Sequence, residues 1–344
     1  MKQTSRNIAA VAARQLARRP VTTLLSHVGR SRRNVLRVLT YHRVCWPDER
    51  RDLCPSTLSA TPADFAAQME CIRDLFNVVD LRQVLFAQAG EHQLPPGAVL
   101  ITFDDAYLDF QEHAWPILQG LELPATMFVA TAYADDPARS FWWDRLHQIV
   151  SAAPVKRKIE TRFGPLTIRT PDERRQVASR MARRLSELAH DEALAELARL
   201  AEMLDTPAAP PAVLDWKQLR RLSDGGLTLA PHTRTHPLMN RIALQQAREE
   251  ARASRDDLSR RIGHSPAAFA FPGGAHNRNL IRMLREEGFE LAFTTCRGAN
   301  HLRRCDPLKL RRINVGRNTS AELLKAQLML PPTVLNGLCR FRGY

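Results

Sequence analysis

No hydrophobic run in the 344-residue sequence is long enough to cross a membrane. A spanning helix needs roughly 18 consecutive apolar residues, and no stretch approaches that length. Internal repeats and low-complexity blocks are also absent. Apolar residues nevertheless make up 44% of the chain, which is enough for a sizeable core. We therefore expect one large folded domain with additions, either soluble or peripheral to a membrane.

The sequence also lacks paired cysteine motifs and a secretory leader. Its six cysteines include no Cys-x-x-Cys pair, and no apolar segment near the start precedes a small-residue cleavage site. These absences favour reduced thiols in a cytoplasmic protein. One alternative is a disulfide between Cys296 and Cys305.

Acidic residues are missing from the first 47 positions, and Asp48 is the first of them. Much of the net charge of +14 therefore comes from this stretch. Its ten cationic residues are Lys2, Arg6, Arg14, Arg18, Arg19, Arg30, Arg32, Arg33, Arg37 and Arg43. Such a segment can bind anionic lipid at the inner membrane face or remain a solvated arm. Residues 7–19 predict a short helix with too little apolar surface to insert deeply, and nucleic acid is the less favoured partner.

Two carboxylates end the clearest buried strand of the sequence. Residues 99–103 are apolar or β-branched and lead directly into Asp104 and Asp105. A second strand-like run, residues 227–230, precedes His232 and His236. A spacing of four would place both imidazoles on one face of a helical turn.

Two imidazoles and one carboxylate form a ligand set for zinc or a similar divalent ion. Three protein ligands leave one position for water, and a second carboxylate could accept a proton from that water. The alternative is that the aspartates cap a helix and the histidines are ordinary loop residues. Because both motifs follow strands, we favour a catalytic metal site.

Strand-like and helical segments alternate along the chain, which predicts an α/β fold whose parallel sheet closes into a barrel. The carboxyl ends of the strands share one edge in such folds, so the aspartates and histidines would meet there. The predicted strands are residues 35–41, 77–80, 99–103, 125–130, 227–230, 267–271, 290–294 and 310–315. The rhythm breaks at about residues 141–214, where a hairpin pattern and charged, Ala/Leu-rich helices predict a mainly helical insertion.

Several segments resemble the polysaccharide deacetylase family, also known as NodB-homology or carbohydrate esterase 4 enzymes. Residues 102–107 (TFDDAY) and 232–236 (HTRTH) are similar to its first two motifs. Further similar segments follow the family's order: 39–44 (LTYHRV), 124–129 (PATMFV), 141–144 (FWWD), 269–274 (FAFPGG) and 310–315 (LRRINV). The resemblance implies a distorted (β/α) barrel of the NodB-homology type. We divide the chain into a basic arm (1–34), a catalytic domain (35–318) and a helical tail (319–344).

The resemblance also implies roles for individual residues. Asp104 would be the general base, and Asp105, His232 and His236 would bind a divalent metal, with zinc the expected ion. In the third motif, Pro272 matches the family proline, and the backbone N–H of Gly273 would stabilise an oxyanion. Substrate contacts are suggested for Tyr107 and Pro272, and for His42 and Arg43 after the first predicted strand, with a satisfied histidine and a surface arginine as the alternative. Trp142 and Trp143 could stack on sugar rings, but packing in the core or at a hinge is the favoured role of both.

Three positions depart from the family pattern. Ala106 replaces a glycine, which would matter only if the backbone there needs a positive φ. Ala270 stands where an arginine often orients the base, so the residue that orients Asp104 is unassigned. The family's late catalytic histidine has no clear match, and His276 and His301 are candidates by position only.

The function we expect is hydrolysis of N-acetyl groups on an amino sugar of a polysaccharide or glycan precursor. An N-acetylated glycan would be the substrate. Two other classes remain open: a catalytically weak carbohydrate-binding relative, and a lipid- or nucleic-acid-binding protein with a vestigial barrel.

Overall fold

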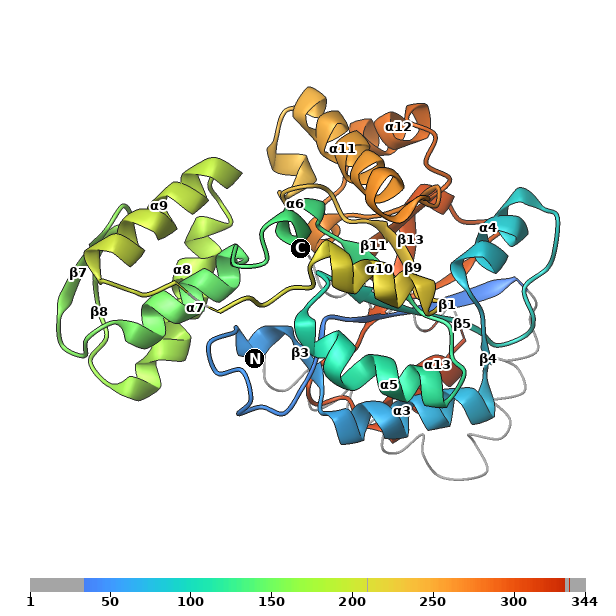
Figure 1. Cartoon of the computed structure of the whole chain (residues 1–344), viewed down its shortest axis with the longest axis horizontal. Helices are drawn as coiled ribbons and strands as arrows, with labels where there is room; N and C mark the ends of the chain where they lie inside the picture. Colours follow the sequence, from blue (N-terminus) through green and yellow to red (C-terminus); the bar gives the residue numbers. More distant parts are fainter. Residues whose placement is uncertain (1–33, 209, 332–333, 335–344) are drawn as a thin grey trace.

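The chain forms a nearly closed barrel of parallel strands surrounded by helices, with a separate helical unit at one side (Figure 1). The computed structural model describes residues 34–208, 210–331 and 334. Seven parallel strands follow one another around the barrel in the order β10 (Ala268–Ala270), β11 (Leu291–Arg297), β13 (Leu310–Asn314), β1 (Val35–Tyr41), β5 (Ala98–Asp104), β6 (Thr126–Val129) and β9 (Thr228–Pro231). Among the described residues, no pairing joins β9 to β10. The predicted NodB-type barrel is therefore confirmed.

The two central strands are buried along their whole length. Every residue of β1 and β5 is buried, as expected for parallel strands with both faces covered. Their register runs from Leu36 opposite Ala98 to Tyr41 opposite Phe103. Both strands therefore end at the same level, and the side chains that follow them meet at one edge of the barrel.

The register of the next two strands brings the histidines to that edge. Asp104 of β5 pairs with Phe128 of β6, and Phe128 pairs with Ala230 of β9. Since β9 ends one residue later, at Pro231, His232 follows beside the carboxyl end of β5. Two short strands also join the sheet: β4 (Asn77–Val78) beside β5, and β12 (Ala299–His301), which pairs antiparallel with β1.

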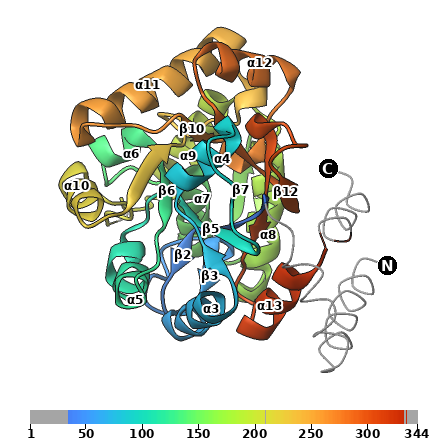
Figure 2. The same cartoon turned by 90° about the vertical axis from the view of Figure 1, so that its right-hand side faces the viewer.

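Helices cover the outside of the barrel on opposite sides. In Figures 1 and 2, α11 (Leu244–Ile262) and α12 (Arg278–Glu286) lie along one side, and α3 (Pro62–Leu75) and α5 (Trp115–Gly120) lie along the other. Thr61 and Asp215 are N-caps of two of these helices, because each side chain accepts a hydrogen bond from the backbone N–H three residues later. The remaining barrel helices are α4 (Leu81–Ala89), α6 (Thr131–Asp135), α10 (Trp216–Asp224) and α13 (Ala321–Met329).

The segment between β6 and β9 leaves the barrel and forms a small unit of its own (Figure 1). It consists of α7 (Trp142–Ala152), a hairpin of β7 (Lys158–Thr161) and β8 (Gly164–Thr167), α8 (Arg174–Leu185) and α9 (His190–Met203). Its helices share a core of buried side chains that includes Ile149, Val177 and Leu197. This core lets the unit hold its shape beside the barrel.

Other expectations need correction or fall outside the structure. Cys296 and Cys305 are free thiols, so the alternative of a disulfide between them is wrong. The basic arm, apart from Asn34, and the chain beyond residue 334 lie outside the described residues. Within the described ranges, no helix combines the length and hydropathy that a membrane crossing requires.

Candidate active site

Three donor atoms converge at the carboxyl edge of the barrel. Asp105 Oδ1 lies 3.3 Å from Nε2 of His236 and 3.6 Å from Nε2 of His232. All three side chains are buried, and their ligand atoms lie within 4.8 Å of one another. The structure thus brings together the three side chains that the sequence suggested as metal ligands.

The donor set fits a tetrahedral metal ion. Two donors at about 2.0–2.1 Å from a tetrahedral zinc are about 3.3–3.4 Å apart, close to the distances around Asp105. Oδ1 of Asp105 is buried and has no hydrogen-bond partner among the described residues. Burial lowers the pKa of His232 to about 4, so its imidazole is neutral, as a ligand must be. Its Nδ1 lies 2.7 Å from the carbonyl oxygen of Ala270, a contact that fixes the ring with Nε2 toward the site.

The backbone around these ligands is unusual, and it corrects one expectation. Residues 232–236 form a loop rather than a helical turn, with φ values of 66° at Thr233 and 60° at His236. Glu250 of α11 holds this loop by accepting hydrogen bonds from the backbone N–H groups of Arg234 and Thr235, at 2.7 and 2.8 Å. The two rings therefore meet because of the loop and its support from α11.

A second turn with positive φ follows β5. Asp105 has a φ of 74° and Ala106 a φ of 53°, a left-handed conformation that costs a non-glycine residue about 1–2 kcal/mol. The replacement of the family glycine by Ala106 therefore falls at a position where glycine would relieve strain. This turn directs the carboxylate of Asp105 toward the histidines while Asp104 ends the strand.

Asp104 is held by an arginine to which the sequence alone assigned no role. Nη1 and Nη2 of Arg312 donate to Oδ1 and Oδ2 of Asp104 at 2.8 and 2.7 Å. Arg312 lies on β13 and also donates from Nε to the carbonyl of Thr294 at 3.0 Å. Burial alone would raise the pKa of Asp104, but the charge and hydrogen bonds of Arg312, together with smaller contributions from His232 and His42, outweigh it, and the pKa falls to about 2. The signal in the sequence was a pair of arginines within a predicted strand, and the structure buries Arg312 while Arg311 is only partly buried.

Trp143 packs against His236, the third proposed ligand, and begins a chain of hydrogen bonds. The ring of Trp143 meets His236 edge-on, with centroids 5.0 Å apart, and its Nε1 donates to the hydroxyl of Tyr107 at 2.8 Å. That hydroxyl donates to Oδ2 of the buried Asp144 at 2.7 Å, and Oδ1 accepts from the backbone of Cys54 at 2.7 Å. Tyr107 and Trp143 thus support His236 from behind. Asp144, which the sequence marked only as part of a motif, anchors both.

The two residues after β1 have different environments. His42 is partly exposed at 28%, and its Nε2 lies 4.0 Å from Oδ2 of Asp105. Arg43 is buried, with Nε donating to Asp109 at 2.7 Å and its guanidinium over the ring of Tyr107. Its charge is therefore already paired inside the protein. Arg43 thus packs inside the protein, and its contact with substrate stays a prediction.

The third motif forms a tight turn after β10. Pro272 is buried, and Gly273 has a φ of 59°, with Leu238 only 3.0 Å from where a Cβ would lie. Neither the strained φ nor this space suits a larger residue. Of the two candidate late histidines, His276 follows this turn, whereas His301 pairs with Val35 at the opposite end of β1. Six residues of strand span about 20 Å, so His301 is too far from the site to act there.

The fold is a barrel of parallel strands with a possible Asp–His–His metal site at their carboxyl ends, and comparison with known proteins identifies its family. The profile described as "Polysaccharide deacetylase" matches residues 91–292, more than half of the chain. The chain belongs to the polysaccharide deacetylase family.

Individual relatives extend this comparison. The poly-beta-1,6-N-acetyl-D-glucosamine N-deacetylase of Escherichia coli (strain K12) is 36% identical over 63 residues, which cover 18% of this chain and 9% of that protein. The match thus spans only about a tenth of the curated relative's length. Among solved structures, the Streptococcus pyogenes deacetylase PplD in complex with acetate has a TM-score of 0.59 at 21% identity, over 86% of this chain and 99% of that one. IcaB from Ammonifex degensii has a TM-score of 0.54 at 20% identity, over 86% and 97%. At these identities the likeness shows a shared fold.

Proposed function

We propose that the protein is a metal-dependent N-deacetylase that removes acetyl groups from an amino sugar in a polysaccharide or glycan precursor. The observation that carries this proposal is the convergence of Asp105, His232 and His236 on one point beside the carboxylate of Asp104. Family membership supports hydrolysis of a carbon–nitrogen bond. The E. coli relative's name makes β-1,6-linked N-acetylglucosamine the first substrate to test.

A divalent ion, with zinc the ion we expect, would polarise the acetyl carbonyl and lower the pKa of the attacking water. Asp104 is the proposed general base, and Arg312 orients its carboxylate. The ion pair with Arg312 fixes the orientation of the Asp104 carboxylate but makes it a weaker base. Its pKa of about 2 lies far below the ideal for a general base at neutral pH. The backbone N–H of Gly273 is the proposed oxyanion donor, in a turn that only a small residue fits.

His42 is our candidate for the proton donor to the leaving amine. It lies within 4.0 Å of Asp105 and is more exposed than the three proposed ligands. An imidazole side chain can both donate and accept a proton, which suits such a role. His276 is the alternative, because it also follows a strand at the carboxyl edge.

The competing hypothesis is a carbohydrate-binding relative with little activity. One reason for this hypothesis was Ala270, which stands where the family often has an arginine that orients the base. In the structure, Arg312 from another strand contacts the carboxylate of Asp104. The deciding experiment measures acetate release from β-1,4- and β-1,6-linked N-acetylglucosamine oligomers. We expect release that a chelator abolishes and that added zinc restores. Oligomer binding without any release would favour the competing hypothesis.

For the basic N-terminal segment we propose reversible attachment to an anionic membrane surface. Eight of the ten cationic residues that precede the first acidic one lie within residues 1–33, and each charge near such a surface contributes about 1 kcal/mol. The other two, Arg37 and Arg43, are buried in the barrel. Attachment of this kind would place the enzyme at the inner face of the membrane while leaving the barrel free in solution.

A further inference from the structure

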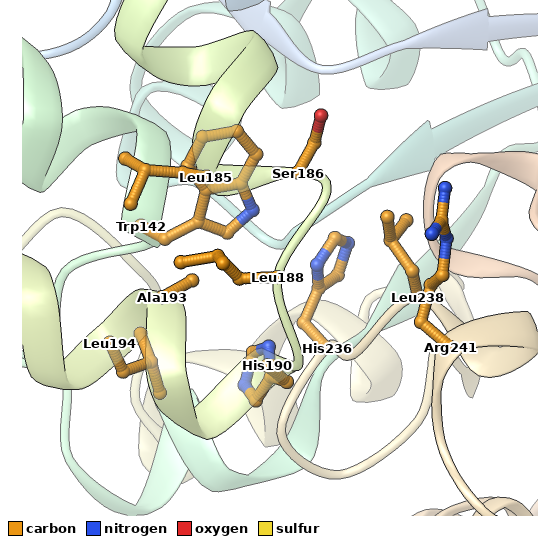
Figure 3. A pocket seen from close by; sticks show the side chains of 10 residues that line it. All are labelled: Trp142, Leu185, Ser186, Leu188, His190, Ala193, Leu194, His236, Leu238 and Arg241. Atoms are coloured by element: carbon orange, nitrogen blue, oxygen red, sulfur yellow. The ribbon is translucent and has the colours of Figure 1, made fainter. Parts of the chain in front are cut away.

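The insertion contributes one wall of a small cavity that reaches a proposed metal ligand. The cavity measures about 30 Å³. Leu188, His190 and Leu194 line it from the insertion, and His236 and Leu238 line it from the barrel loop (Figure 3). Nε2 of His190 is buried there without a hydrogen-bond partner among the described residues. Residues of the insertion and a proposed metal ligand therefore line the same cavity.

A much larger groove lies at the junction where the insertion leaves and rejoins the barrel. It measures about 570 Å³, within the roughly 300–1,000 Å³ of typical ligand sites. Its walls are α7 and α9, together with the connecting segments around Ser140 and Thr206. Trp142 and Leu194 line both the groove and the smaller cavity. The two spaces are thus neighbours that share a wall.

The lining of the groove suits a sugar. Trp142 is half-buried and stands at 80° to Trp143, which is held against His236. Small and apolar side chains of α9 form the floor, among them Leu197 and Ala198. At the rim, Glu202 and Asp205 are exposed and form no ion pair among the described residues. An aromatic face with nearby carboxylate acceptors matches the apolar face and hydroxyl edge of a pyranose ring.

We propose that this groove binds the sugar units that flank the unit being deacetylated, so that the insertion makes the enzyme select polymeric over short substrates. The inference rests on the proposed function, because the groove shares Trp142 and Leu194 with the smaller cavity that the proposed metal ligand His236 lines. Its occupant is an N-acetylhexosamine oligomer, with Trp142 as the stacking platform and Glu202 and Asp205 as hydrogen-bond acceptors for hydroxyls.

The test fills the groove without touching the metal site. Ala198 is exposed on α9 and lines the groove, so Ala198→Trp would occupy the space of a sugar unit. Ala195 is exposed on the same helix but does not line the groove, which makes Ala195→Trp a matched control. For each full-length protein with zinc, kcat/KM is measured on dimers and pentamers of β-1,4- and β-1,6-linked N-acetylglucosamine.

We expect the wild type and Ala195→Trp to prefer the pentamer by about tenfold, equivalent to about 1.4 kcal/mol. Ala198→Trp should lose this preference while retaining its rate on the dimer. A wild type without length preference, or an Ala198→Trp protein that keeps it, would overturn the inference.

A second measurement separates this inference from the proposed function. If no oligomer releases acetate, the proposed function fails. Calorimetric measurement of pentamer binding then tests, independently of catalysis, whether the groove binds sugar. Binding that Ala198→Trp abolishes and Ala195→Trp retains would support the groove. Equal binding by both variants, or no binding by the wild type, would reject it.

Discussion

Arg312 and Asp104, 208 positions apart in sequence, form a buried bidentate ion pair inside the barrel. Two charged groups at this depth remain stable only because each satisfies the other, and removing one partner of such a pair is costly. The pair also determines how the proposed base faces the substrate. It is therefore the contact whose loss should separate positioning from metal binding.

Replacing Arg312 with Gln should reduce turnover while the metal content stays unchanged. Without the guanidinium, burial raises the pKa of Asp104, so more of this carboxyl is protonated at pH 5. The variant should therefore lose more activity, relative to the wild type, at pH 5 than at pH 8. We expect a stability loss of about 3 kcal/mol from the unpaired buried carboxylate. The pH–rate profile and urea unfolding measure both effects. The neighbouring Arg311→Gln serves as control, and a profile like the control's would contradict the assignment.

Replacing Asp105 with Asn, or His232 with Ala, should remove metal and activity together, because only three side chains would hold the proposed ion. Elemental analysis of the purified proteins measures the metal content. His92→Ala is a suitable control, since His92 is exposed and belongs to neither group of possible metal ligands among the described residues. Full metal occupancy in both ligand variants would refute the proposed site.

Asp104→Asn should retain metal and lose turnover on the order of 10²- to 10⁴-fold, the usual effect of removing a general base. The structure separates the two carboxylates, since Asp104 contacts Arg312 and Asp105 contacts the histidines. Metal content and kcat are measured side by side with Asp105→Asn. Loss of metal from Asp104→Asn, with retention in Asp105→Asn, would reverse the two roles.

The buried carboxyl of Asp144 should make stability depend on pH. Burial raises its pKa to about 7, compared with about 3.9 in an unfolded chain. The native state then binds more protons than the unfolded state between these values, so stability falls as pH rises from about 4 to about 7. Asp144→Asn should remove this slope, which approaches about 1.4 kcal/mol per pH unit between the two pKa values. Urea unfolding against pH measures it.

Asp256→Asn is the control for this experiment, because Asp256 is exposed on α11. Its stability should follow the wild-type curve across the whole pH range. If Asp144→Asn also runs parallel to the wild type, the carboxyl does not titrate as the structure implies.

Neutralising part of the N-terminal segment should weaken membrane attachment without affecting catalysis. We expect the full-length quadruple variant of Arg6, Arg14, Arg18 and Arg19 to Gln to sediment less with anionic vesicles at low salt. Hydrolysis of a soluble oligomer should remain unchanged. The control neutralises the exposed residues Arg175, Arg180, Arg183 and Arg184 of the insertion. Failure of the wild type to sediment, or equal loss in both variants, would leave the segment as a solvated arm.

Much of the fold could be predicted because its signals are local. Apolar runs such as residues 35–41 and 99–103 are buried strands in the structure, as the sequence predicted. The candidate ligands could also be predicted, since strand ends in a parallel sheet share one edge. Side-chain type and position relative to a strand were enough to name Asp105, His232 and His236.

Only the tertiary structure shows which residues support the proposed base and the three candidate metal ligands. Arg312 reaches Asp104 because β13 lies two strands away from β5, with β1 between them, and no periodicity in the sequence states which strands are neighbours. Strand register likewise separates His42, at the catalytic edge, from His301, at the far end of β1. Packing against His236 distinguishes Trp143 from its neighbour Trp142, which lines the groove. Partners of this kind depend on contacts between distant segments, and such contacts exist only once the barrel has formed.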